Sequence, residues 1–406
     1  MIDMKDRQLL FLFLSSFIIL FVGMGLFPLL PLYATEFGAT PTTIGYYFAI
    51  MYVANTAGTM LTARAAQWLT RRGAFVIAGI LGLPSLFLMG QTTAFWQLVL
   101  LTALAWFSGG MNIALVNVLT GLHANGQRRG ASFTLMFVAL PLGSLFGGAI
   151  VGRLVDFYGF TVTFNVLTLL WIAVPLIGLL ALEDRHADVP VQAGTSPDMA
   201  APPLGRRFAL LMAVTLFSSL AIHAARLGAP LTMQALTFSA SDISAATAIG
   251  GLVTVPVALL LGTLSDRMGR ERFLTLSYVL AAFGAAVLIG ATQIWQFWLA
   301  VTLMTVALST SGALASALAT DALPPAALAR GLPRIRAMNS IAGIISFAGA
   351  GYILETQGPV SLFIVAASFA GFAALGVRPL HAACGDIIRV LRKQVFTLDC
   401  YGRAVA

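Results

Sequence analysis

Residues 262–273 read GTLSDRMGRERF, a charged segment that lies between two long apolar runs. In the whole 406-residue chain, charged residues make up only 9% of the sequence and hydrophobic residues make up 59%. A soluble domain carries about 25% charged residues, so this composition cannot supply a water-exposed surface. The sequence therefore predicts an all-α integral membrane protein in which 262–273 joins two membrane-spanning helices.

The rest of the chain alternates in the same way between apolar runs and short polar turns. A membrane-spanning helix needs about 20 mostly apolar residues, and turn-forming segments such as FGATP, HANGQRRG and ETQGP separate runs of that length. Twelve spans are predicted, at 9–33, 42–66, 73–91, 95–119, 131–153, 159–182, 208–229, 242–265, 272–290, 294–317, 336–354 and 359–377. The first exceeds the ~7–15 apolar residues of a signal peptide and has no small-residue cleavage site.

Basic residues fall almost entirely on one side of the predicted membrane. An even number of spans puts both termini on the same side, and all 23 Lys and Arg residues except Arg153 and Arg226 fall there. The positive-inside rule assigns that side to the cytoplasm. The net charge of +8 therefore reflects topology and argues against nucleic-acid binding. We expect a bacterial inner (plasma) membrane protein with both termini cytoplasmic.

The sequence of the first half returns in the second half at a nearly constant offset. Asp156 aligns with Glu355, and Gly159 aligns with Gly358. Two homologous six-helix halves, with a substrate site between them near the middle of the membrane, are typical of two-bundle transporters. The predicted organisation is an N-terminal six-helix bundle (1–182), a cytoplasmic linker (183–207), a C-terminal six-helix bundle (208–377) and a cytoplasmic tail (378–406), with a central cavity between the bundles.

The segment 262–273 also resembles the signature G-x-L-x-D-R-x-G-R-[RK] of the major facilitator superfamily. In that family the signature lies in the cytoplasmic loop between the second and third helices of a half. Together with the twelve spans and the half-repeat, the resemblance covers nearly the whole chain and implies transport by alternating access. The counterpart in the first half, 63–75, has lost the acid, because Gln67 stands in its place.

Asp266 lies at the C-terminal end of a predicted helix, where a negative charge opposes the helix dipole and needs compensation. The resemblance implies that the N-terminus of the fifth helix, in the other half, supplies it and so latches the cytoplasmic face closed. The predicted latch residues are Gly262, Asp266, Arg267, Gly269, Arg270, Arg129 and Gly130. The alternative is that these charges only fix the topology.

The fifth helix carries part of a second motif, G-x8-G-x3-G-P-x2-G-G, which is typical of drug:proton antiporters in this superfamily. The matching positions include Gly143, Ser144, Gly147 and Gly148, with serine in place of the proline. The resemblance favours the twelve-helix antiporter branch and multidrug efflux. The alternative is ordinary close packing of helices through small residues.

Ionisable residues inside a membrane are costly and usually functional, and the seventh helix holds two of them. His223 and Arg226 are three residues apart and share a helix face, so an inward-facing pair would bind an anionic group. The alternative is that Arg226 extends to water at the membrane surface. The other candidate substrate-binding residues are Trp106, Asn117, Asn112 and Asn55, for which packing or hydrogen bonding between helices is the alternative.

The motifs of enzymes and metal sites are missing from this sequence. It has no phosphate-binding loop of the GxxxxGK[ST] kind, no nucleophile–base set and no His/Cys metal spacing, so we expect no cofactor and no ATP drive. The leading hypothesis is a monomeric secondary transporter that exports small apolar or amphiphilic molecules, with protons and the lipid bilayer as further partners. The alternatives are an organic-anion or metabolite permease that uses His223 and Arg226, and a membrane scaffold or sensor that no longer transports.

Overall fold

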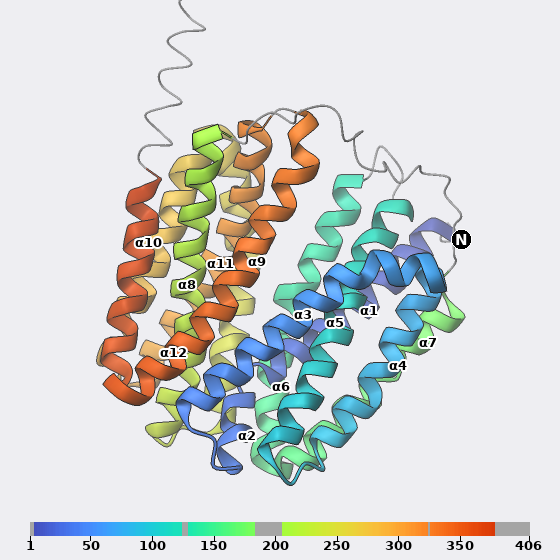
Figure 1. The fold of residues 1–406 in the computed structure, drawn as a ribbon, viewed down its shortest axis with the longest axis horizontal. Coiled ribbons are helices and arrows are strands. Elements are labelled where there is room, and N and C mark those ends of the chain that lie inside the picture. Colours follow the sequence, from blue (N-terminus) through green and yellow to red (C-terminus); the bar gives the residue numbers. More distant parts are fainter. Residues whose placement is uncertain (1–3, 124–128, 183–204, 324, 378–406) are drawn as a thin grey trace, which may run out of the picture.

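The computed structural model describes residues 4–123, 129–182, 205–323 and 325–377, which are almost entirely helical (Figure 1). The helices are α1 (Met4–Leu26), α2 (Leu30–Glu36), α3 (Pro41–Leu69), α4 (Arg71–Met89), α5 (Phe95–His123), α6 (Arg129–Trp171), α7 (Ala173–Leu180), α8 (Gly205–Ala235), α9 (Ala240–Met268), α10 (Arg270–Leu288), α11 (Ile294–Ala322) and α12 (Pro325–Gly376). The predicted tail and most of the predicted linker lie outside the described residues, so the domain boundaries remain predictions.

Two of these helices reverse direction at a glycine and so contain two spans each. In α6 the turn is at Gly159, with φ 75°, and in α12 it is at Gly358, with φ 82°. Residues that carry a Cβ disfavour such positive φ angles, whereas glycine accepts them. The two glycines are the pair that the half-repeat aligns, so the same turn recurs in both halves. Conversely, α1 and α2 form a single span that is interrupted around Pro28.

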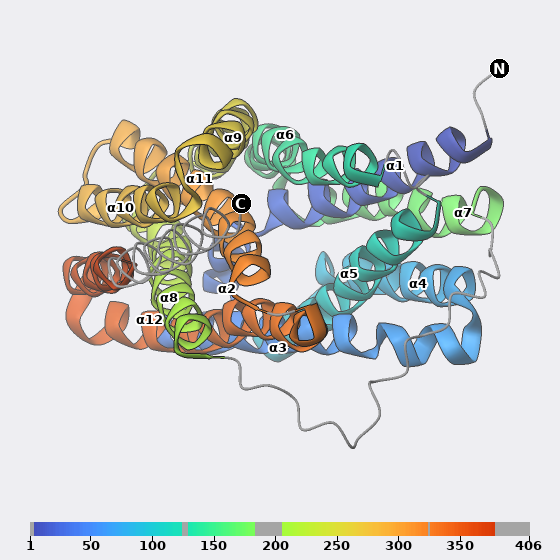
Figure 2. The ribbon, with the colours of Figure 1, turned by 90° about the horizontal axis from the view of Figure 1, so that it is seen from above.

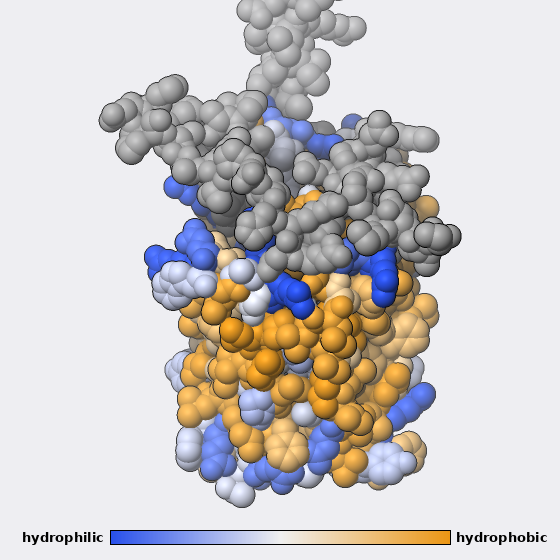
Figure 3. Space-filling view, turned by 90° about the vertical axis from the view of Figure 1, so that its right-hand side faces the viewer, coloured by the Kyte–Doolittle hydropathy of each residue, from blue (hydrophilic) through white to orange (hydrophobic). Residues whose placement is uncertain are grey.

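The helices of the structure account for the twelve predicted spans. Nine helices in the described part of the chain are long and apolar enough to cross a membrane. Two of the nine contain two spans each, namely α12 and α6, whose second span continues into α7, and α3 provides a further helix of 29 residues. Figure 3 shows an apolar belt with polar residues at both ends, as a bilayer requires. The predicted fold of twelve spanning helices in two six-helix halves is confirmed.

The two halves, α1–α7 and α8–α12, meet along two helix pairs (Figure 2). Helix α3 packs against α12, and α6 packs against α9. Small residues allow this close approach: a Cβ on Gly351 would lie 2.9 Å from Cα of Gly45, and a Cβ on Gly148 would lie 2.6 Å from the backbone nitrogen of Ala248. Toward the opposite end of the molecule the ribbons of the two halves spread apart (Figure 1).

These two ends differ in the residues that they carry. We call the end at which the halves meet the closed face, and define it by Thr42, Asp156, Ser241 and Glu355. We call the other end the basic face, because arginines gather there at the ends of α4, α8, α10 and α12. The described arginines of the basic face include Arg7, Arg64, Arg71, Arg72, Arg206, Arg207, Arg270, Arg272, Arg334 and Arg336.

Candidate functional site

A cavity lies between the two halves, and α1, α6, α8, α9 and α11 contribute residues to its wall. The space that these residues border amounts to about 870 Å³ and includes open solvent. Apolar side chains form most of the wall, among them Met24, Leu140, Met304 and Leu308. Hydroxyl groups come from Ser144, Thr247, Thr254, Thr305 and Ser309. Among the described residues of the wall, Arg226 is the one that carries a charge.

Arg226 turns its guanidinium into this cavity. The residue is half-buried on α8, and its Cζ lies 4.0 Å from the centre of the Phe27 ring. A cation over an aromatic face at this distance is held by a cation–π attraction. The interruption between α1 and α2 carries the Phe27 ring to this place. The structure therefore favours the cavity-facing interpretation of Arg226 over extension to the membrane surface.

His223 lies one turn before Arg226 on α8 and is buried. Its Nδ1 is 2.7 Å from the carbonyl oxygen of Ser219, and its Nε2 is 3.1 Å from the hydroxyl of Tyr52. Tyr52 belongs to α3 in the other half, and the Arg226 guanidinium is within hydrogen-bonding reach of the same hydroxyl. A tyrosine from the first half thus joins the two residues that the sequence predicts as a pair in the second half.

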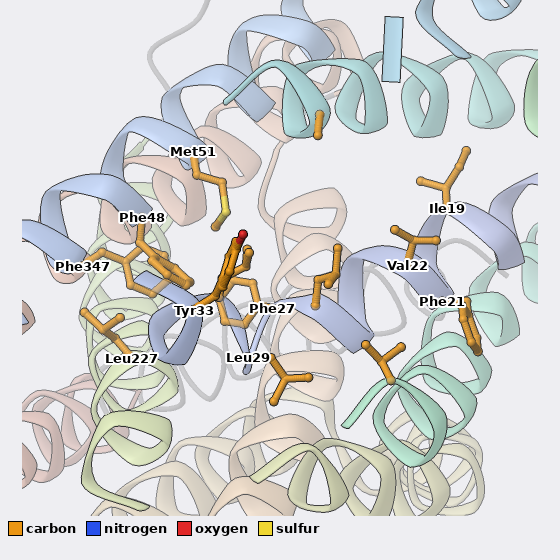
Figure 4. Close-up of a cluster of buried hydrophobic side chains, with 14 of the residues drawn as sticks. Ile19, Phe21, Val22, Phe27, Leu29, Tyr33, Phe48, Met51, Leu227 and Phe347 are labelled. Atoms are coloured by element: carbon orange, nitrogen blue, oxygen red, sulfur yellow. The ribbon is translucent and has the colours of Figure 1, made fainter. Parts of the chain in front are cut away.

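Aromatic rings from both halves lie beside this polar group, and Figure 4 shows three of them, Phe27, Phe48 and Phe347, gathered in one cluster. The Phe347 ring of α12 has its centroid 4.9 Å from that of Tyr52, 5.3 Å from that of His223 and 5.4 Å from that of Phe48. Phe27 meets Phe48 edge to face at 5.2 Å. Edge-to-face packing of this kind is favourable beyond the burial of area alone. These ring contacts therefore hold Phe27 and Tyr52 in place next to the Arg226 guanidinium.

Hydrogen bonds that cross between the halves hold the closed face together. Asp156 of α6 accepts hydrogen bonds from the backbone N–H groups of Ala240 (3.0 Å) and Ser241 (2.8 Å), the first two residues of α9. Glu355 of α12 accepts one from the backbone N–H of Thr42 (2.8 Å), the second residue of α3. The N–H groups of a first helical turn have no partner inside the helix and form the positive end of its dipole. Both carboxylates therefore cap a helix of the opposite half.

The capping contacts also determine the charge state of Glu355, which lies in the turn between the two spans of α12. Hydrogen bonds from the Thr42 hydroxyl, the Thr42 N–H and the Thr40 hydroxyl lower the pKa of Glu355 below its ordinary value of 4.5. The contacts favour the carboxylate, because each of them donates a hydrogen to its oxygen atoms. The contacts therefore extend the range in which Glu355 is ionised to more acidic pH.

The other four candidate substrate-binding residues do not line this cavity. Trp106 is half-buried on α5, and its carbonyl oxygen accepts a hydrogen bond from Asn55 Nδ2 at 3.3 Å. Asn112 is fully buried. In the amide orientation that gives both of its polar atoms a partner, its nitrogen donates to the carbonyl oxygen of Phe75 (2.9 Å) and its oxygen accepts from the N–H of Gly79 (3.2 Å), both in α4. Asn117 is exposed. Asn55 and Asn112 therefore make hydrogen bonds between helices, which is the alternative given for them above, and a substrate-binding role for Trp106 and Asn117 remains a prediction.

The predicted latch falls on the basic face, where the structure describes only part of it. Helix α6 begins at Arg129 and α9 ends at Met268. The side chains of Arg129, Gly130, Gly262, Asp266 and Arg267 lie outside the described ones, so the latch remains a prediction. Gly269, with φ 102°, turns the chain between α9 and α10. Arg270 forms an ion pair of 2.9 Å with Asp321, at the end of α11 in its own half.

The predicted motif of the fifth helix lies on two faces of α6. Gly143 and Gly147 pack against the backbone of α1, whereas Gly148 packs against α9. Ser144, which replaces the proline of the motif, lines the cavity. The motif residues therefore allow α6 to approach α1 and α9 closely, which is the packing role given above as the alternative.

Three features of the site were not predicted: Tyr52, Phe27 and the two helix caps. Nothing distinguishes Phe27 in a chain with 28 phenylalanines, or Tyr52 among eight tyrosines. The two helix caps, in contrast, have a signal in the sequence. The offset that aligns Asp156 with Glu355 also aligns Thr42 with Ser241, so it pairs the two acids and the two helix starts together.

The chain was compared with protein families and with solved structures. The model of the Major Facilitator Superfamily matches it twice, over residues 12–231 and 208–383. A mutant of the nucleoside transporter NupG is similar in structure, with a TM-score of 0.77 and 17% identity, over 94% of this chain and 99% of that chain. A POT family transporter in complex with a thioalcohol-conjugated peptide has a TM-score of 0.74 and 13% identity, over 94% and 96%.

A bacterial homolog of the human lysosomal transporter Spinster, in an inward-facing and unoccupied conformation, has a TM-score of 0.70 and 14% identity, over 93% of this chain and 97% of that chain. No curated protein matches the chain in sequence. At these identities the solved structures establish the fold alone. The family model covers both halves of the chain, each of which carries the expected bundle of spans. The chain therefore belongs to the Major Facilitator Superfamily of membrane transporters.

Proposed function

We propose that this chain is a secondary active transporter that moves small, largely apolar molecules across the membrane by alternating access, as a proton-coupled exporter. The observation that carries the proposal is the cavity between the halves, whose wall is apolar apart from Arg226 and a few hydroxyl groups. Alternating access requires a central site of this kind, which opens to one side of the membrane at a time as the halves rock.

The positive-inside rule supports an orientation with the basic face in the cytoplasm of a bacterial inner membrane. In that orientation the hydrogen bonds of Asp156 and Glu355 close the outer side, and the halves spread apart toward the cytoplasm. This arrangement loads a substrate from the cytoplasm. Release outside requires that the halves separate at the closed face and approach each other at the basic face, where the predicted Asp266 latch would hold them.

Proton coupling is the finer part of the proposal. The partial motif at Gly143, Ser144, Gly147 and Gly148 resembles that of drug:proton antiporters. His223 is a titratable group one turn from Arg226 and hydrogen-bonded to the opposite half. Protonation of its ring would add a second positive charge beside Arg226. An inward proton flux through this region would drive the substrate outward.

Transport by the purified protein in proteoliposomes, under an imposed pH gradient, tests the proposal. The panel contains cationic, neutral and anionic compounds of similar size, with protein-free liposomes and a protonophore as controls. We expect accumulation of a compound against its own gradient that stops when the protonophore collapses the pH gradient. Transport that does not depend on the pH gradient would rule out proton coupling, and the protein would still be a transporter. Movement of no compound under any gradient would favour a scaffold or sensor.

One alternative function gains support from the site itself. The guanidinium of Arg226 faces the cavity and lies over Phe27, as an organic-anion or metabolite permease requires. The scaffold or sensor has less support, because residues from both halves line a single cavity of about 870 Å³.

A further inference from the structure

We propose that Arg226 binds the anionic group of the transported molecule, so that the substrate is an organic anion, such as a carboxylate, attached to an apolar body. This inference rests on the proposed transport by alternating access, and it assigns to that transporter the substrate class of the alternative permease. It starts from the cost of a cation inside a membrane, which is tolerated where the cation meets a partner or lines a water-filled cavity. Among the side chains that the structure describes, no carboxylate pairs with Arg226, so the position of the anion is open to a ligand.

The surroundings of the guanidinium restrict how a ligand approaches it. The Phe27 ring covers one side at 4.0 Å, and the Tyr52 hydroxyl is within hydrogen-bonding reach on the side of α3. A guanidinium has five N–H donors in a planar fork, which matches the two oxygens of a carboxylate. The donors that Tyr52 does not accept are available toward the cavity, of which Arg226 forms part of the wall.

The rest of the cavity determines the body of the ligand. Met24, Leu140, Met304 and Leu308 offer apolar and flexible surface, and methionine adapts to irregular shapes. Several hydroxyl groups of α9 and α11 are already bonded within their own helices, as in Thr254 to Gly250 and Thr305 to Val301. The wall therefore favours a hydrophobic body with few hydrogen-bonding groups. An apolar body with one acidic end fits both parts of the site.

Tyr52 is a positioning residue in this proposal, because it acts on the ligand through Arg226. It belongs to the first half, whereas Arg226 and His223 belong to the second half. Phe27 also belongs to the first half, so both residues that orient the guanidinium come from across the junction. When the halves rock apart at the closed face, Arg226 leaves these contacts. The affinity for the anion therefore differs between the two states of the transporter, as transport against a gradient requires.

Matched ligands test the anion proposal. The experiment measures binding and transport for an apolar carboxylic acid, its methyl ester and the amine of the same skeleton, with the full chain in proteoliposomes. We expect the carboxylate to bind about 10- to 100-fold more tightly than the ester, the ratio typical of a lost charge-assisted contact. Arg226→Gln should abolish this difference. Arg153→Gln, the other arginine outside the predicted cytoplasmic set, is the matched control and should preserve it.

The outcomes separate the two proposals. If the wild-type protein transports the ester or the amine as well as the carboxylate, and Arg226→Gln changes nothing, the anion proposal is wrong and the transporter stands. If no compound moves, the transport function itself fails. Arg226→Gln removes a cation from the membrane interior, so we expect its melting temperature without ligand to be maintained. Tyr52→Phe keeps the ring against Phe347 and should weaken carboxylate binding about 3- to 10-fold without changing ester binding.

A different observation carries a second inference. We infer that Asp156 and Glu355 form a two-part latch that holds the closed face together, with one acid from each half capping a helix of the other half. Their hydrogen bonds, at 2.8 to 3.0 Å, all cross between the halves. The backbones pack closely beside both caps: a Cβ on Gly351 would meet Gly45 at 2.9 Å, and one on Gly152 would meet Cα of Ser241 at 2.9 Å.

The latch is a feature of one conformation only. Separation of the halves at the closed face removes the cap contacts, so the acids stabilise the closed arrangement relative to the open one. A carboxylate that accepts backbone N–H groups at a helix start combines a charge-assisted hydrogen bond with a favourable dipole interaction. Removing one cap should therefore shift the conformational equilibrium about 3- to 10-fold.

Distance measurements by electron paramagnetic resonance test the latch, with spin labels at the exposed positions Phe157 and Trp295 and with Cys384 and Cys400 replaced by serine. Asp156→Ala and Glu355→Ala should each add a population at longer distance, and the double variant should increase it further. Asp321→Asn, on the basic face, should leave the distribution unchanged. An unchanged distribution in the double variant would overturn the latch. So would an equal change in Asp321→Asn, because it would indicate a general loss of structure.

Discussion

Asp156 and Glu355 make the same contact in opposite directions across the molecule, but they do so with different numbers of backbone donors. Asp156 accepts from both Ala240 and Ser241 at the start of α9. At the start of α3 the residue equivalent to Ala240 is Pro41, which has no N–H group. Glu355 is therefore limited to one backbone donor and completes its contacts with threonine hydroxyls. The repeat relates the two caps to each other, and this one proline makes them chemically unequal.

The Glu355 cap should make closure of this face dependent on external pH. Contacts with Thr42 and Thr40 lower the pKa of Glu355 below 4.5. Because the pKa of Glu355 is lower in the closed state, the cap stabilises closure at pH values above the ordinary pKa of glutamate. This stabilisation is lost as the pH falls through the lowered pKa of the closed state. In Asp156→Ala, where Glu355 is the remaining cap, we expect the long-distance population to grow as the pH drops from about 5 to about 3. The spin-label pair described above measures this population.

The matched control for the pH effect is Glu355→Gln in the same Asp156→Ala background. Glutamine has no titrating carboxyl group, so its distance distribution should be flat over this pH range. An equal pH response with and without Glu355 would assign the titration to another group and contradict the prediction.

Gly351 should be essential for closure, whereas Gly349 on the same helix should not. A Cβ on Gly351 would meet the carbonyl oxygen of Pro41 and lie 2.9 Å from Cα of Gly45, both in the other half. A Cβ on Gly349 would meet no atom within 4 Å. Overpacking of a tight contact costs about 1–3 kcal/mol. Gly351→Ala should therefore shift the spin-label distances toward the state in which the halves separate at this face, with a much smaller shift for Gly349→Ala.

Because the strained contact joins the halves and not the helices within a half, Gly351→Ala should open the closed face without unfolding either half. Circular dichroism in detergent checks this point, since the helix content should equal that of the wild type. A loss of helix content in Gly351→Ala, with no change in distance before unfolding, would contradict the prediction.

The predicted latch on the basic face should act in the opposite sense to the closed-face caps. Asp266 lies at the end of α9, where its negative charge opposes the dipole of its own helix, and the sequence predicts that the start of α6 compensates it. Asp266→Asn should then weaken closure of the basic face and favour the state in which the closed face stays shut. Cysteine labelling at Arg334, from the side of the basic face, should become faster. Arg206→Gln is the control, because this exposed arginine of the basic face is not one of the predicted latch residues.

The fold was predictable because apolar runs and glycine turns report directly on spans. The site was less predictable, because its geometry depends on contacts between elements that are far apart in sequence. Arg226 was identified from its cost inside a membrane, and that argument does not depend on its neighbours. Trp106 and Asn117 remain predictions, because sharing a face of a helix does not indicate whether that face meets the cavity or a neighbouring helix. Phe27 and Tyr52 belong to the site only because the two halves meet there.

His223 should be required for proton coupling and not for substrate binding. Its ring is buried between Tyr52 and Phe347 and makes two hydrogen bonds, one of them across the junction. Protonation of the ring would place a second positive charge beside Arg226 and change the contact with Tyr52, so it would link proton binding to the separation of the halves. His223→Gln keeps a polar group of similar size and should retain exchange of substrate across equilibrated membranes. Accumulation driven by a pH gradient should fall at least about tenfold. His123→Gln, at the end of α5, is the matched control, and pH-driven accumulation that survives in His223→Gln would assign proton coupling to a different group.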